Sequence, residues 1–129
     1  MLRAILSAVA GVAAWIAVVT LLNFGLRYGL PGYHAAEPTM AFTLPMMIAR
    51  LAESTIALAA AAIVTARLSR GAAAAPWVLS AAFLAIFIPI HYAIWDKFPV
   101  WYHAYFLASL VAIPVIVGSV TRGTRAAAA

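Results

Sequence analysis

Hydrophobic residues in this chain fall into four long runs, and most of the polar residues gather between them. Each run approaches the roughly 20 apolar residues that a helix needs to cross the hydrocarbon core of a bilayer. The segments between the runs contain proline, glycine and charged residues, which disfavour a continuous helix. We therefore predict four transmembrane helices, at approximately residues 4–26, 44–66, 76–95 and 99–120.

The first run has to be distinguished from a cleaved signal peptide. A signal peptide has a shorter apolar core, followed by small residues at a cleavage site. This run continues through Trp15, Ile16 and Leu21 to a membrane-spanning length, which favours a retained helix. The polar connection after it, 28–43, contains Pro31 and is the longest of the expected connections.

The composition supports a membrane protein. Hydrophobic residues make up 67% of the 129-residue chain and charged residues only 9%, too few for the polar surface of an ordinary soluble domain. Four spans with short connections use up this length, so we expect no separate soluble domain. The prediction is an all-α integral membrane four-helix bundle, a single domain over 1–129, in contact with the lipid bilayer.

Apart from Arg50, basic residues lie singly or in pairs at the ends of the apolar runs, a pattern that indicates membrane topology rather than nucleic-acid binding. Lysine and arginine next to a span are retained on the cytoplasmic side. Placing both termini inside gives the cytoplasm the larger basic group, which is Arg3, Arg67, Arg70, Arg122 and Arg125. Arg27 and Lys97 then lie outside. With the excess of arginine and alanine, this predicts a multi-pass protein of a bacterial inner membrane.

Motifs for enzyme chemistry are absent from the sequence. The chain has no cysteine, which excludes disulfides, thiolate metal sites and dithiol redox chemistry. It also lacks the metalloprotease HExxH pattern, a phosphate-binding loop and a nucleophile elbow. The sequence therefore gives no support to a catalytic role.

Two charged residues, Arg50 and Glu53, lie inside the second apolar run. Charges at membrane depth are costly and persist where they face protein or a water-filled cavity. At 100° per residue they share one helix face with Ser54 and Ala57, and small residues of this kind let helices approach closely. We therefore predict that this face points into the bundle.

The role of this pair stays open. At a spacing of three residues, Arg50 and Glu53 could neutralise each other and serve only to fix helix packing. Alternatively, Arg50 could bind an anionic or carbonyl group, or Glu53 could take up a proton or cation. The sequence does not distinguish the structural from the functional interpretation.

His91 and His103 lie on either side of the 96–98 turn at similar depth, so a helical hairpin could bring their rings together. A haem between them is disfavoured, because adjacent helices pack only about 8 to 10 Å apart. A single zinc or copper ion fits better, and nearby methionines could add thioether ligands for copper. Hydrogen bonding to a substrate or proton transfer is a further role.

Asn23, near the outer end of the first span, completes a predicted polar pocket with Arg50, Glu53, His91 and His103. Three functions are compatible with such a pocket. The first is a non-catalytic binding protein or accessory subunit of a membrane complex. The second is a transporter or channel for a small solute or ion, which at this size would need to form a homo-oligomer. The third is a periplasm-facing metal or redox site.

Overall fold

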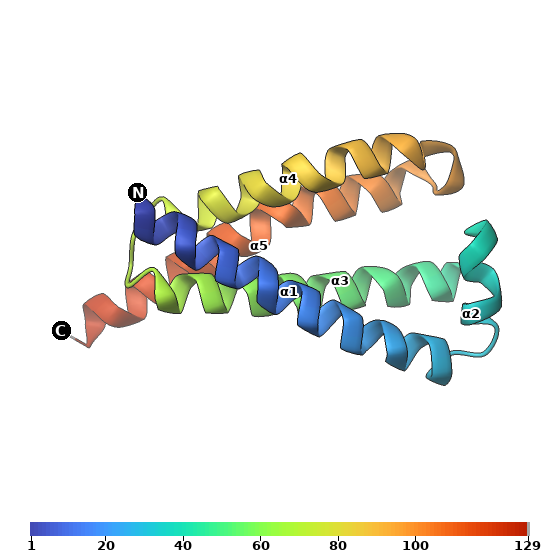
Figure 1. The fold of residues 1–129 in the computed structure, drawn as a ribbon, viewed down its shortest axis with the longest axis horizontal. Coiled ribbons are helices and arrows are strands. Elements are labelled where there is room, and N and C mark those ends of the chain that lie inside the picture. Colours follow the sequence, from blue (N-terminus) through green and yellow to red (C-terminus); the bar gives the residue numbers. More distant parts are fainter. Residues whose placement is uncertain (129) are drawn as a thin grey trace.

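The computed structural model describes residues 1–128, and in that part of the chain helices are the only regular secondary structure (Figure 1). Its long helices are α1 (Leu2–Gly29), α3 (Leu44–Leu68), α4 (Ala75–Ala93) and α5 (Val100–Ala127). The short elements are α2 (Tyr33–Ala36), η1 (Glu37–Thr39) and η2 (Trp95–Lys97). All four long helices are long and apolar enough to cross a membrane. The predicted four-helix transmembrane fold is confirmed, and residue 129 of the predicted alanine tail lies outside the described residues.

The helix boundaries follow local chemistry. Pro45 and Pro76 lie in the first turns of α3 and α4, where a missing backbone N–H costs nothing. Thr43 occupies the N-cap position of α3 with an extended backbone, although its side chain makes no capping hydrogen bond. The third span ends at Ala93, slightly earlier than predicted, because Trp95 begins the η2 turn.

The long helices pack as a ring, in the order α1, α3, α5 and α4, with α4 and α5 forming a hairpin. Both chain ends lie at one end of the bundle, called here the termini end (Figure 1). The opposite end carries α2 and the η2 turn and is called the α2 end. This arrangement follows from four spans that alternate in direction.

Close packing at the termini end depends on small residues. The buried residues of α1 are Ala4, Ser7, Ala8 and Gly11. The Thr65 hydroxyl of α3 donates a hydrogen bond to the Ser7 carbonyl at 3.1 Å. A side chain at Gly11 would collide with Thr65 and with the Ala61 carbonyl. Helix α1 can lie this close to α3 only because Gly11 has no side chain.

Toward the α2 end, α1 separates from α4 (Figure 1). No residue of α1 after Gly11 is fully buried. The Trp15 ring packs edge-on against Phe83 and Phe87 of α4, with centroids 5.6 and 5.3 Å away. Beyond this contact the two helices enclose a cavity instead of packing together.

Replacing Gly11 should test the packing at the termini end. We expect Gly11→Ala to lower the free energy of unfolding by about 1–3 kcal/mol, because the new Cβ meets a backbone carbonyl that cannot move freely. Gly25→Ala is the matched control, since nothing lies within 4 Å of a Cβ there. Thermal unfolding in detergent measures both, and equal stability of the two variants would contradict the packing interpretation.

Candidate functional site

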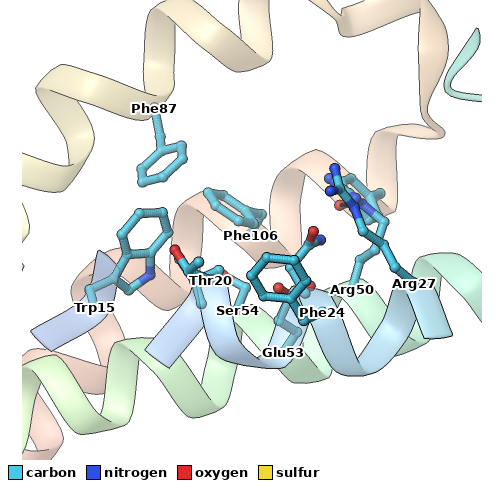
Figure 2. Close-up of a pocket in the computed structure, with 12 residues that line it drawn as sticks. Trp15, Thr20, Phe24, Arg27, Arg50, Glu53, Ser54, Phe87 and Phe106 are labelled. Atoms are coloured by element: carbon cyan, nitrogen blue, oxygen red, sulfur yellow. Dashed lines mark hydrogen bonds between the residues drawn. The ribbon is translucent and has the colours of Figure 1, made fainter. Parts of the chain in front are cut away.

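A cavity of about 340 Å³ lies between α1, α3, α4 and α5 in the half of the bundle nearer the α2 end (Figure 2). Its polar lining is contributed by Thr20, Asn23, Arg27, Arg50, Glu53 and Ser54. Its apolar and aromatic lining consists of Trp15, Val19, Phe24, Phe87, Tyr102 and Phe106. The cavity is therefore amphipathic, with its charged groups toward α3 and the end of α1.

Arg50 is held by neutral partners. Its Nη1 donates to the Tyr33 hydroxyl at 2.6 Å and its Nε to the Tyr102 hydroxyl at 3.3 Å. The Phe42 ring centroid lies 4.6 Å from the guanidinium carbon, a cation–π contact. Burial raises the pKa of Tyr33, outside the spans, so its hydroxyl is protonated at neutral pH. Arg50 thus connects α2, α3 and α5.

Glu53 lies one helical turn from Arg50 and faces the same cavity (Figure 2). Only 7% of Glu53 is exposed, and its Oε1 atom has no hydrogen-bond partner among residues 1–128. The Asn23 side chain interacts with the carboxylate. Within the described residues, no direct ion pair joins Arg50 to Glu53. The two side chains therefore make no direct contact as an ion pair, and whether their role is structural or functional stays a prediction.

Ser54 adds a second unsatisfied group to the cavity. Its side chain is buried, and its Oγ atom has no hydrogen-bond partner among residues 1–128. An unpaired polar atom in a buried position costs about 1–3 kcal/mol. Both Glu53 and Ser54 line the cavity, so a molecule bound there can supply the missing hydrogen bonds.

An ion pair lies at the α2 end of the cavity. Arg27 Nε contacts both oxygens of Glu37, at 2.8 and 3.0 Å, and the His34 ring lies 3.0 Å from the same carboxylate. Burial acts to raise the pKa of Glu37, but the hydrogen bonds from His34 and Arg27 outweigh it and lower the pKa. Glu37 is therefore ionised at neutral pH and joins the connection 30–43 to the end of α1.

His91 and His103 meet across the α4–α5 hairpin but do not line the cavity. Their Nδ1 atoms lie 2.7 Å apart, and both residues are buried. Phe106 lies between them and the cavity, with its ring centroid 4.3 Å from that of His91. The predicted pocket of five residues is thus divided, because only Asn23, Arg50 and Glu53 share the cavity.

The Trp95 carbonyl determines which ring nitrogens of His91 and His103 carry a proton. His103 Nε2 lies 3.3 Å from that carbonyl oxygen, which can only accept a hydrogen bond, so Nε2 carries the proton. When both rings are neutral, His91 Nδ1–H then donates to His103 Nδ1. His91 Nε2 keeps its lone pair.

The predicted zinc or copper site has two ligands in the structure. Within residues 1–128, no group of three His, Cys, Asp or Glu side chains is placed to hold a metal ion. An ion bound by both Nδ1 atoms would also have to replace the hydrogen bond between them. Metal binding by His91 and His103 stays a prediction.

Tyr33, Tyr102 and the Arg27–Glu37 pair were not anticipated as site residues. The sequence feature that could have indicated the Arg27–Glu37 pair is charge, because the chain has only three acidic residues. Glu37 lies in the first outer connection, and Arg27 immediately precedes that connection. Pairing that carboxylate with the nearest arginine would have predicted the contact. Comparisons of the chain with protein-family models, curated proteins and solved structures gave no match.

Removing either tyrosine hydroxyl should destabilise the α2 end. We expect Tyr33→Phe and Tyr102→Phe each to lower the free energy of unfolding by about 1–3 kcal/mol, because a partly buried guanidinium N–H loses its acceptor. Tyr92→Phe is the control, since Tyr92 is 83% exposed. Unfolding midpoints in detergent test this. A loss no larger than that of the control would show that Arg50 does not depend on the tyrosines.

Proposed function

We propose that this chain is a non-catalytic binding protein of the membrane, whose cavity holds a small ligand against Arg50, Glu53 and Asn23. The observation that carries the proposal is the pair of unsatisfied buried atoms, Glu53 Oε1 and Ser54 Oγ, on the wall of a 340 Å³ cavity. Ligand sites in proteins are typically concave and mostly apolar, with a few converging polar groups. The described cavity has these properties.

Binding is favoured over transport by where the cavity ends. Its lining stops at Trp15, Ser54 and Phe87, and beyond this level α1 packs on α3 through Gly11 and its neighbours. A transport path would have to continue through that close packing. Transport by a homo-oligomer is therefore the second candidate, and a role as accessory subunit of a membrane complex is compatible with ligand binding.

We further propose that the chain resides in a bacterial inner membrane with both termini in the cytoplasm. The termini end carries Arg67, Arg70 and Arg122, while Arg27 at the α2 end is paired with Glu37. Basic residues next to spans are retained inside. The cavity would then lie in the outer half of the bilayer.

The absence of cysteine makes the orientation directly testable. Asp96 in the η2 turn and Ala73 in the α3–α4 loop are both exposed. A single cysteine can therefore be introduced at either position for labelling. We expect a membrane-impermeant maleimide to label Asp96→Cys in spheroplasts, and to label Ala73→Cys only after lysis. The reverse pattern would place the cavity in the inner half of the membrane and contradict the proposal.

Ligand binding can be tested without knowing the ligand. We expect protein purified from its native membrane in mild detergent to carry a bound small molecule in native mass spectrometry. Glu53→Gln should reduce its occupancy about tenfold, since a charged acceptor is lost. Asp96→Asn, which removes an exposed carboxylate outside the cavity, should retain the molecule. A protein with no bound molecule, or with equal occupancy in Glu53→Gln, would contradict the binding proposal.

A further inference from the structure

The cavity opens sideways, between α1 and α4. In α1, Thr20 and Phe24 line the cavity and are themselves exposed. In α4, the segment 84–90 contains no fully buried residue, although Phe87 lines the cavity. Both helices are membrane spans by length and composition, so this opening faces the hydrocarbon of the bilayer.

At its α2 end the cavity is bounded by side chains that are bonded to other groups, and Arg50 lines both this cavity and a second pocket. Arg27 is paired with Glu37, and Arg50 is bonded to Tyr33, which is fully buried. Beside them the Phe42 ring stacks on Phe98, with centroids 5.9 Å apart. A ligand that enters at this end has to pass the bonded side chains of Arg27 and Arg50, whereas the opening between α1 and α4 gives a membrane-dissolved molecule direct access.

The charges around the cavity balance one another. With Glu53 as a carboxylate, Arg50 and Glu53 contribute one charge of each sign, and Arg27 is neutralised by Glu37. A ligand with a net charge would add an uncompensated charge at membrane depth, which is costly. An uncharged headgroup avoids this cost.

The unsatisfied atoms specify the hydrogen bonding of that headgroup. Glu53 Oε1, as part of a carboxylate, needs a donor. The Ser54 hydroxyl can donate to an oxygen. A ligand hydroxyl supplies both, because it donates through its proton and accepts through its lone pairs. An ether or a hydrocarbon lacks the donor.

Aromatic side chains form the remaining walls (Figure 2). Trp15 and Phe24 come from α1, Phe87 from α4 and Phe106 from α5. Aromatic rings pair favourably in edge-to-face or offset arrangements, beyond the gain from burial alone. A cavity of 340 Å³ is large enough for a substituted ring but not for a whole membrane lipid.

We infer that the cavity binds an uncharged amphiphile of the phenol class, which includes alkylphenols and quinols. Its hydroxyl bonds to Glu53 and Ser54, its ring lies among Trp15, Phe87 and Phe106, and its apolar tail extends between α1 and α4 into the bilayer. This inference rests on the proposed binding function and specifies the ligand class.

Quenching of tryptophan fluorescence in lipid nanodiscs tests the ligand class, because Trp15 lines the cavity. The probes are a bromine-substituted hexylphenol, its methyl ether, and a bromine-substituted aliphatic alcohol of the same length. We expect saturable quenching by the phenol, and binding at least about tenfold weaker for the ether, which cannot donate to a charged acceptor. Weaker binding of the aliphatic alcohol supports the aromatic part of the inference, and equal binding overturns it. Equal binding of ether and phenol overturns the hydroxyl contact.

Variants locate the probe within the protein. Glu53→Gln and Ser54→Ala should weaken phenol binding, the first by about tenfold. Ser80→Ala is the matched control, because Ser80 is also buried and its Oγ is also unpaired in the described residues, but it does not line the cavity. Trp15→Phe should keep binding but lose most of the quenching. Unchanged affinity in both Glu53→Gln and Ser54→Ala overturns the inference.

The two proposals fail in different ways. If native mass spectrometry finds a molecule that is lost in Glu53→Gln while the phenol probe does not bind, the binding function stands and the phenol class is wrong. If neither the native molecule nor the phenol is bound, both proposals are wrong. Saturable phenol binding that is weakened in Glu53→Gln supports both.

Discussion

The burial of the Arg50 charge inside a membrane span is the constraint on which the α2 end of this protein depends. A guanidinium in an apolar environment has to be hydrogen-bonded, and here the acceptors are neutral hydroxyls of Tyr33 and Tyr102. Because Tyr33 belongs to the connection between α1 and α3, satisfying Arg50 folds that connection back onto the bundle. Because Tyr102 belongs to α5, the same residue fixes α5 against α3. The use of neutral partners also has a consequence for Glu53, which keeps an unpaired oxygen instead of an arginine contact.

The cavity results from a contrast along α1. Its first part carries small residues up to Gly11 and lies close to α3 and α4, whereas its later part carries Trp15 and Phe24. The Trp15 side chain lies between α1 and α4, where it contacts Phe83 and Phe87. A helix that is held closely at one end and displaced by a large side chain further along must diverge from its neighbour. The space that opens lies at the depth of Glu53, so the unpaired carboxylate oxygen and the cavity occur together.

The sequence was sufficient to predict the fold, because four apolar runs of this length have few alternatives to four spans. It also predicted that Arg50 and Glu53 face the bundle, since α3 has one small, polar face. The partners of Arg50 were not predictable in the same way. Tyr33 and Tyr102 are 17 and 52 residues from it, and tyrosines near span ends are also expected from the membrane interface alone. The sequence did not predict that the histidines lie outside the cavity. Because α4 is apolar on nearly every side, its sequence does not indicate which helix face points into the bundle.

The histidine pair lies behind Phe106 and thereby connects the α4–α5 hairpin to the cavity wall. Since the Trp95 carbonyl fixes the proton on His103 Nε2, a first added proton can go only to His91 Nε2 if the bond between the Nδ1 atoms is to persist. A second added proton would put two donors face to face and break that bond. The hydrogen bond between His91 and His103 therefore joins α4 to α5 when the pair is neutral or singly protonated. Because His91 packs directly on Phe106, a ring that also lines the cavity, any rearrangement of the pair would change the cavity wall opposite Glu53.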